Sequence, residues 1–443
     1  MKILVKRLGI NGEGVGTLEN EGELDNKVCF VSGVLPGETA EVSVVADKKN
    51  YLLCKLDNLI DKSPNRVEPK CPYFDKCGGC DLQHMDKQMQ LDFKKDKVKE
   101  TILKVSKITA DVNDTIRLND YQYRNKMTYP VVTKNGRAVV GMFARSSHRI
   151  VDIDRCLLCS NIINDIYISI KEYIEKSNFC GYDFKSKKGD IKYIVIREHS
   201  GQVIITVVST KKIDIKPLYE YLHSSYKSIG LSLLISNNDD EIMSGKYIHI
   251  AGIESLEIKE FSVKYKIDNR GFLQVNNELK SALYTAVLNN IDNKDLVIDA
   301  YSGAGLMTAI IARKCRRVIG IEINEAASNS AKQLAIDNNL KNMECITGDV
   351  KAHMGQVLTR LDNVVVVLDP ARSGCDKAVL DCLTSTENLS KISKIIYVSC
   401  NPSTLARDLG VLKEHYDILS ITPWDMFPQT KHTETVVCLQ RRV

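Results

Sequence analysis

From about residue 270 onward, short apolar runs alternate with stretches that read as helices. The apolar runs are DLVIDAY, RVIGIEI, MECITGD, NVVVVLD and KIIYVSC. Unbroken apolar character is typical of strands buried on both faces, and strands that alternate with helices form parallel sheets. We therefore predict a parallel, doubly wound sheet and a Rossmann-like α/β domain over residues 269–443. In such sheets, ligands bind outside the carboxyl ends of the strands.

The rest of the chain divides into two further regions, because 443 residues are too many for one ordinary core. Residues 1–62 hold short β-rich runs broken by glycine turns, which indicates a small, OB-like β-barrel of a kind that often binds nucleic acid. Residues 63–268 mix strand-like runs with helices near 87–105 and 161–176, an α+β pattern. The helix near 87–105 could instead pack on the C-terminal domain.

The composition is that of a globular protein that stays in the cytoplasm. Hydrophobic residues make up 44% and charged residues 26% of the chain, which is ordinary for soluble proteins. No apolar run approaches the roughly 18 residues of a membrane span, and the N-terminus lacks the apolar core of a signal peptide. The net charge of +5 is mild. Basic clusters such as that at 313–317 suit the neutralisation of phosphates, or form a solvated surface.

A candidate nucleoside site follows the first two strands of the α/β domain. LVIDAYSGAG (296–305) reads as a buried strand and a glycine turn, and an apolar helix begins near Leu306. Glycines let the backbone approach a nucleoside ligand at a helix N-terminus. Glu322 ends the next strand, about 20 residues on, where such folds place an acid on the ribose hydroxyls. Asp349 ends the third strand and is a candidate adenine contact.

NAD is the first alternative ligand for this turn. The turn reads Gly-x-Gly-x-x-Thr with Gly303, Gly305 and Thr308, and it lacks the third glycine of the dinucleotide fingerprint. No hydride-transfer motif follows, whereas two later motifs suit methyl transfer.

Two reactive side chains follow the fourth and fifth strands. VVVVLDPAR places Asp369 at the carboxyl end of one strand, and KIIYVSCNP places Cys400 at the carboxyl end of the next. Both therefore belong to the edge of the sheet where ligands bind. A small buried core residue is the alternative interpretation of Cys400, since that is the commoner place for a cysteine.

The motifs Asp-Pro-Ala-Arg (369–372), Ser-Cys-Asn-Pro (399–402) and DMFPQTKHTE (425–434) together resemble the RNA uracil-C5 methyltransferase family. FLQVNNELKSALY (272–284) is similar to the stretch that precedes the donor motif in that family. The resemblance implies a Rossmann-like methyltransferase domain that uses S-adenosyl-L-methionine.

The resemblance also implies the roles of individual residues. Gln274 and Tyr301 contact the methyl donor, together with Glu322, Asp349 and Asp369. Cys400 attacks carbon 6 of a uracil, and Glu434 acts as the base. The chemistry requires such a pair, because uracil carbon 5 is too weak a nucleophile until a thiolate adds at carbon 6. After methyl transfer, carbon 5 still carries its proton, which a base must remove. A surface acid is the alternative interpretation of Glu434.

A second cluster of cysteines lies in CPYFDKCGGC, which holds Cys71, Cys77 and Cys80. In a reducing compartment, three thiols this close indicate a metal site rather than disulfides. Zinc favours two C-x2-C knuckles, and only one close pair is present. An iron–sulfur cluster takes four cysteines.

Resemblance to the iron–sulfur branch of the same family supplies the fourth ligand. SSHRIVDIDRCLLC (146–159) is similar to the segment that carries it and aligns Cys156, with Cys159 as the near alternative. The resemblance implies a [4Fe–4S] cluster in the central α+β domain. It also identifies the barrel as a TRAM domain, and YRNKMTYP (123–130) resembles another family segment. Leu306 and Ala371 depart from the usual pattern of the family.

The resemblance implies that the protein methylates uridine in RNA, and not in DNA, as a monomer. The expected target is 23S rRNA, with tRNA as the alternative, and the uridine must be flipped out or presented in a loop. Two other interpretations stay open. One is a non-catalytic iron–sulfur RNA-binding protein, and the other is a methyltransferase that acts on a protein or a small molecule.

Overall fold

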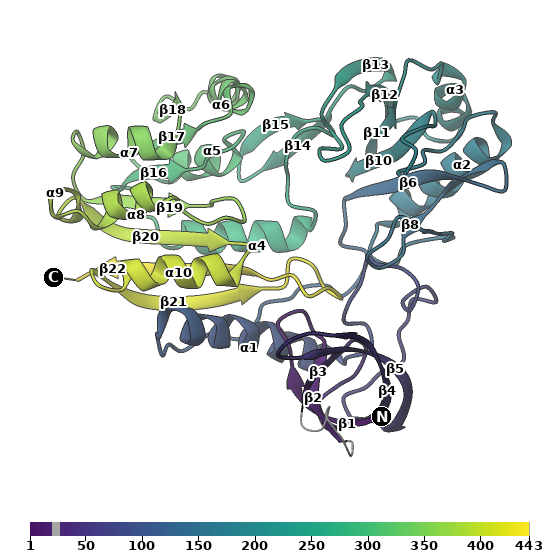
Figure 1. Cartoon of the computed structure of the whole chain (residues 1–443). Helices are drawn as coiled ribbons and strands as arrows, with labels where there is room; N and C mark the ends of the chain where they lie inside the picture. The colour runs from purple at the N-terminus through teal and green to yellow at the C-terminus, as the bar shows by residue number, and fades with distance from the viewer. Residues whose placement is uncertain (20–26, 443) are drawn as a thin grey trace.

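The computed structural model describes residues 1–19 and 27–442. It consists of a closed barrel, a six-stranded sheet with two helices, and a seven-stranded sheet flanked by helices (Figure 1). Within the described residues, no helix is long and apolar enough to cross a membrane.

The N-terminal region forms the predicted barrel, which closes in the order β1-β2-β3-β5-β4. Its strands are β1 (Lys2–Leu8), β2 (Gly14–Glu19), β3 (Val28–Val31), β4 (Thr39–Asp47) and β5 (Leu52–Asp61). Exposed and buried residues alternate along β1, as expected for a strand with one face on a core. Gly16 lies inside β2, where a Cβ atom would come within 2.2 Å of the Leu4 carbonyl oxygen, so close strand contact requires glycine there.

The central region is built on a six-stranded sheet in the order β13-β12-β11-β10-β6-β7. Only β11 and β12 pair in parallel among these neighbours. The helix predicted near 161–176 packs its apolar side chains on this sheet. The strands are β6 (Lys126–Lys134), β7 (Arg137–Val140), β10 (Ile191–His199), β11 (Gln202–Ser209), β12 (Ile229–Ile235) and β13 (Lys246–Gly252), and the helices are α2 (Asn161–Lys176) and α3 (Lys216–Ser225). Two small hairpins accompany it: β8 (Met142–Phe143) with β9 (Ile150–Val151), and β14 (Leu256–Glu260) with β15 (Val263–Ile267).

The C-terminal region contains a seven-stranded sheet in the order β18-β17-β16-β19-β20-β22-β21. The first five strands along the chain pair in parallel, as predicted. They are β16 (Leu296–Ala300), β17 (Arg317–Glu322), β18 (Met343–Thr347), β19 (Val364–Leu368) and β20 (Ile392–Ser399). The sheet also has an antiparallel edge, which the sequence did not predict. There β22 (Glu434–Arg441) inserts antiparallel between β20 and β21 (Tyr416–Trp424).

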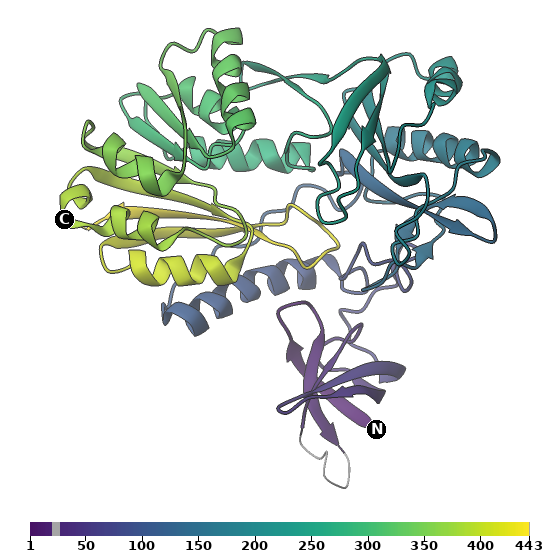
Figure 2. The same ribbon diagram turned by 45° about the horizontal axis from the view of Figure 1, so that its top comes forward.

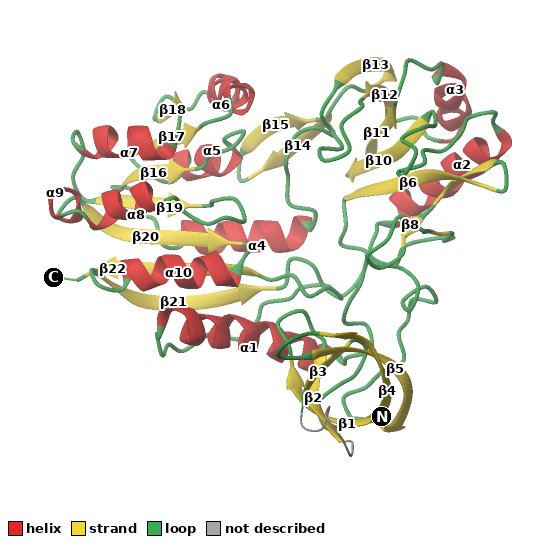
Figure 3. Ribbon diagram, in the orientation of Figure 1, coloured by secondary structure: helices red, strands yellow, loops and turns green. Residues whose placement is uncertain are grey.

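Helices cover both faces of this sheet (Figure 3). The helices are α1 (Lys87–Ser106), α4 (Asn277–Leu288), α5 (Leu306–Ala312), α6 (Glu325–Asp337), α7 (Val350–Leu358), α8 (Lys377–Thr384), α9 (Thr386–Leu389) and α10 (Pro402–Leu412). One core contains side chains from α1, α7, α8 and α10, and another contains side chains from α4, α5 and α6.

Helix α1 packs on the C-terminal domain, which the sequence left as an alternative. Val98 and Ile102 enter the core beneath α10. The Lys94 ammonium forms an ion pair with Asp425, and both side chains are fully buried. The start of α1 also contacts the barrel through Phe93 and Leu35. Figure 2 shows the barrel set apart from both sheets and lying near the start of α1.

Candidate active site

The carboxyl edge of the parallel strands gathers most of the side chains singled out from the sequence. Each ends a strand or lies within two residues of its end: Tyr301 follows β16, Glu322 ends β17, Asp349 lies two residues after β18, Asp369 follows β19 and Cys400 follows β20. Because these strands are parallel neighbours in the sheet, their ends meet at one edge.

The glycine turn is held in a conformation that needs glycine. Gly303 and Gly305 have φ of +55° and +81°, and a Cβ atom on Gly305 would lie 2.5 Å from the Cβ atom of Ala331. Tyr301 also has a positive φ of 68°, which is uncommon for an aromatic residue and marks a constrained turn. The turn therefore brings its backbone close to the helix that follows β17.

Glu322 and Asp349 lie beside this turn and are partly exposed. The Gly303 N–H donates to one carboxylate oxygen of Glu322 at 2.8 Å, and the Asn324 N–H donates to the other at 2.7 Å. Asp349 caps α7 by accepting from the Lys351 N–H at 3.1 Å. Each carboxylate oxygen can accept further hydrogen bonds, so these contacts leave both acids able to receive ligand hydroxyl or amino groups.

Gln274 lies in the segment that leads into α4. Its backbone carbonyl accepts from the Asn125 side-chain amide at 3.1 Å, and the Val275 carbonyl accepts from the Asn125 N–H at 2.8 Å. The structure therefore brings the family-like segment 123–130 against the residue predicted to contact the donor. Gln274 itself is half-buried.

Asp299 is a further candidate site residue, which was not identified from the sequence. It lies within β16, is 1% exposed, and accepts from the Thr308 hydroxyl at 2.5 Å. Burial raises the pKa of its carboxyl to about 7. A single acid within an otherwise apolar strand was the signal in the sequence that could have identified it.

Cys400 and Glu434 meet through the register of two antiparallel strands. Ser399 of β20 pairs with Thr435 of β22, so the next residues outward, Cys400 and Glu434, lie across from each other. Burial raises the pKa of the Cys400 thiol, and the Glu434 carboxylate raises it further. Glu434 is 5% exposed, and burial raises its pKa to about 8, with Asp369 adding to the effect.

Arg372 opposes these shifts. Its guanidinium lowers the pKa of Cys400 and of Glu434, although neither effect outweighs burial. The Arg372 carbonyl accepts from the side chains of Asn401 at 3.0 Å and Thr404 at 3.2 Å, which hold this turn against the start of α10. The sequence motif contains Arg372, but only the fold brings its charge near the cysteine.

Asp369 lies between the donor-side acids and the cysteine. Its side chain is exposed to solvent, and desolvation by the surrounding protein atoms raises the pKa of its carboxyl to about 6. Such a group is placed to accept a hydrogen bond from a ligand at the carboxyl edge.

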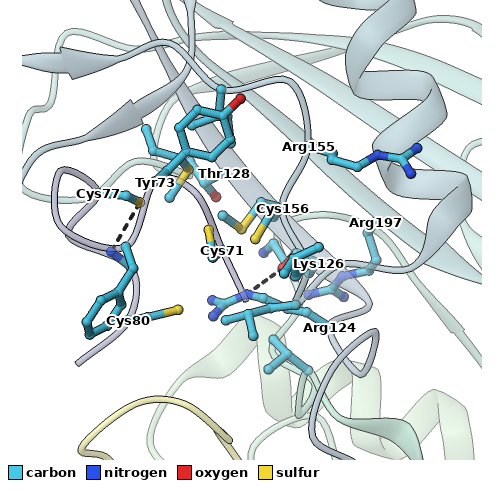
Figure 4. A pocket seen from close by; sticks show the side chains of 18 of the residues that line it. Cys71, Tyr73, Cys77, Cys80, Arg124, Lys126, Thr128, Arg155, Cys156 and Arg197 are labelled. Carbon is cyan, nitrogen blue, oxygen red and sulfur yellow. Dashed lines mark hydrogen bonds between the residues drawn. The ribbon is translucent and has the colours of Figure 1, made fainter. Parts of the chain in front are cut away.

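The predicted metal ligands lie elsewhere, around a cavity of about 520 Å³ next to the central sheet. Cys71, Cys77, Cys80 and Cys156 all line it, as Figure 4 shows. Burial raises the pKa of the Cys80 thiol to about 12 and raises the pKa of Cys71 and Cys77. Cys159, the alternative ligand, is fully buried in the core behind the sheet, beside the Tyr129 hydroxyl at 3.8 Å.

The size of the cavity bears on which group these cysteines can hold. Within residues 1–19 and 27–442, no three cysteine, histidine or acidic side chains lie close enough to hold one metal ion. A four-iron cluster is larger than one ion, and its four cysteine ligands surround it. Four cysteines line this one cavity, which is the number of ligands that such a cluster takes. The neighbouring Cys159 thiol lowers the pKa of the Cys156 thiol.

Comparison with known proteins agrees with the N-terminal barrel and the C-terminal α/β domain. The family model for tRNA (uracil-5-)-methyltransferase matches residues 86–442, and the model for the TRAM domain matches residues 1–56. An uncharacterized RNA methyltransferase from Clostridium tetani is 34% identical over 449 residues, which cover 99% of this chain and 95% of that protein. Another from Halalkalibacterium halodurans is 33% identical, with 99% and 96% covered.

The fold is also found among solved structures. The crystal structure of the Pyrococcus abyssi tRNA (uracil-54, C5)-methyltransferase in complex with S-adenosyl-L-homocysteine aligns with a TM-score of 0.76 and 25% identity. The alignment covers 99% of this chain and all of that one. With a family model that spans most of the chain and relatives similar over its whole length, the chain belongs to the tRNA (uracil-5-)-methyltransferase family and carries an N-terminal TRAM domain.

Proposed function

We propose that this protein methylates carbon 5 of a uridine in RNA, with Cys400 as the covalent nucleophile and Glu434 as the base. The observation that carries the proposal is the strand register that sets these two residues across from each other, at the same edge of the sheet as the glycine turn. A non-catalytic RNA-binding protein would not need this pair.

The residues divide the reaction into steps. The Cys400 thiolate adds to carbon 6 of the uracil, which makes carbon 5 nucleophilic. Carbon 5 then takes the methyl group from S-adenosylmethionine, whose sulfur–methyl bond breaks to leave S-adenosylhomocysteine. Glu434 then removes the remaining proton from carbon 5, and the bond between Cys400 and carbon 6 breaks to return the thiolate. Gln274, Tyr301, Glu322, Asp349 and Asp369 are proposed to bind and orient the donor.

The four cysteines at the central cavity are proposed to hold a [4Fe–4S] cluster, with Cys156 rather than Cys159 as the fourth ligand. Support comes from the cavity, which Cys156 lines and Cys159 does not. The methyl transfer moves no electrons, so a bound cluster would act as a cross-link between the loop at 71–80 and the segment at 150–159.

The target RNA is proposed to be 23S rRNA, as the resemblance to the iron–sulfur branch implies. A second candidate is tRNA, which the similarity to the Pyrococcus abyssi tRNA methyltransferase favours. The three domains 1–62, 63–268 and 269–443 are proposed to act together, with the TRAM barrel binding RNA outside the active site.

The choice of RNA can be tested by mapping 5-methyluridine in a strain that lacks this protein. We expect one or more 5-methyluridines to disappear from 23S rRNA while those in tRNA remain. Loss from tRNA alone would transfer the proposal to the second candidate. An unchanged pattern in both RNAs would contradict uridine methylation of either target.

Glu434→Gln is expected to trap the reaction after methyl transfer. The amide cannot take the proton from carbon 5, so a methylated protein–RNA adduct should accumulate. A denaturing gel with methyl-labelled donor would detect it. Cys400→Ala is the matched control, because it should form no adduct and lose well over 90% of turnover, a barrier increase of more than about 1.4 kcal/mol. Turnover by Cys400→Ala above a tenth of the wild-type rate would refute the nucleophile assignment.

The release step should depend on the ionisation of Glu434. Its pKa is raised to about 8, so the basic form is lost as pH falls through that value. Release should therefore slow about tenfold per pH unit below about pH 7 and level off above about pH 9. Arg372→Ala should move the profile to higher pH, because it removes the cation that lowers the pKa.

The control for this measurement is Arg372→Lys, which keeps a positive charge. Both variants retain the Arg372 carbonyl that holds Asn401 and Thr404, so the turn itself should survive. Single-turnover release of labelled product across pH would give the profiles. Identical profiles for the alanine variant and the wild type would show that Arg372 does not tune this base.

Protein purified without oxygen is expected to be brown and to contain about four iron atoms and four sulfides per chain. Cys156→Ser should bleach it and destabilise the central region, because ligation contributes to folding. Cys159→Ser should keep the colour. Iron and sulfide analysis with visible absorption would distinguish the variants, and zinc in place of iron would overturn the cluster assignment.

A further inference from the structure

Residues 425–433 form the loop that connects β21 to Glu434, the first residue of β22. This loop is unusual in being buried, because Asp425 and Met426 are fully buried and Gln429 is 4% exposed. Gln429 also has a left-handed backbone with φ of 69°. A buried loop in such a conformation needs partners elsewhere for its polar groups.

The cysteine loop supplies some of these partners. The N–H groups of Asp81 and Leu82 both donate to the Gln429 carbonyl, at 2.9 and 3.0 Å. In return, the Lys431 N–H donates to the Asp81 carboxylate at 3.2 Å. Asp81 directly follows Cys80, so the backbone that carries a predicted cluster ligand is hydrogen-bonded to the loop that ends at the predicted base.

Helix α1 and the segment after it hold the same loop from other sides. The Gln90 side-chain amide donates to the Gln429 side chain at 3.0 Å and to the Leu82 carbonyl at 3.1 Å. The Tyr123 hydroxyl donates to the Pro428 carbonyl at 3.0 Å. Gln90 thus ties the cysteine loop and the base-bearing loop into one network.

We propose that Asp81 and Leu82 are positioning residues for Glu434, so that ligation of Cys80 controls where the base lies. The inference rests on the proposed function of Glu434. When Cys80 is fixed in a cluster, the two N–H groups that follow it are fixed as well, and they hold the Gln429 carbonyl. When Cys80 is not bound to a cluster, the 71–82 segment no longer restrains the 425–433 loop. This gives a cluster a role in a reaction that transfers no electrons.

The first experiment measures hydrogen exchange without any reaction. The anaerobically purified full-length protein is compared with the same protein after its iron is removed with an oxidant and a chelator. We expect peptides covering 425–434 to lose protection together with those covering 71–85, while those covering 191–235 in the central sheet keep it. Loss confined to 71–85, or no change in either segment, would overturn the proposal.

The second experiment separates positioning from folding. Asp81→Ala loses the acceptor for the Lys431 N–H, whereas Asp81→Asn keeps a side-chain oxygen that can accept it. We expect the alanine variant to form the methylated adduct at close to the wild-type rate but to release product roughly 10- to 100-fold more slowly, since a misplacement of about 1 Å can cost about 100-fold. The asparagine variant should restore release.

Asp75→Ala is the matched control, because Asp75 is an exposed acid of the same cysteine loop and its loss should leave release unchanged. Wild-type release by Asp81→Ala, or equal slowing of formation and release, would contradict a positioning role. If the proposed function itself is wrong, the experiments give a different result. In that case no variant, including Glu434→Gln, forms an adduct, while hydrogen exchange still reports whether the two loops are coupled.

Discussion

The antiparallel pairing of β20 with β22 is the interaction on which the proposed chemistry depends. Side chains alternate between the two faces of a strand, so a slip of one residue would turn Glu434 to the opposite side from Cys400. The register is fixed by burial, because the residues of β22 from Glu434 to Leu439 are all buried between neighbouring strands and helices. A slip would therefore disturb the whole core of this edge, and the two reacting groups stay across from each other as a consequence of packing.

The buried charges under α1 fix the position of Asp425, where the loop between β21 and β22 begins. Lys94 and Arg117 both contact the Asp425 carboxylate, and the three side chains are at most 1% exposed. Burial lowers the pKa of Lys94 to about 8, against the effect of Asp425. Desolvating such groups is costly, and removal of one partner from a buried pair costs about 3–5 kcal/mol. The arrangement therefore contributes little net stability, but it strongly disfavours any other placement of α1 against the loop that begins at Asp425.

The sequence predicted the parallel strands, the barrel and the helices near 87–105 and 161–176, because each depends on local periodicity and composition. It also placed Cys400 and the acids at strand ends, since that follows from strand order alone. The direction of β22 was not predictable, because an apolar run does not reveal which neighbour it pairs with. The hydrogen bond from Asp81 to Gln429 could not be predicted from the sequence either, because it uses backbone groups that every residue has and joins positions far apart in the chain.

The charges around the cysteine cavity also bear on which group can occupy it. Arg124, Lys126 and Arg197 line this cavity together with the thiols. Arg197 is 2% exposed, and its Nε–H is without a hydrogen-bond partner among the described residues. Burial and the nearby Arg197 lower the pKa of Lys126 to about 7. A cation buried as deeply as Arg197 is unfavourable beside neutral thiols, whereas four ligating thiolates bring negative charge into the same space. The lining charges thus favour an anionic, thiolate-bound group over an apolar void, and they support the proposed cluster independently of the spacing of the cysteines.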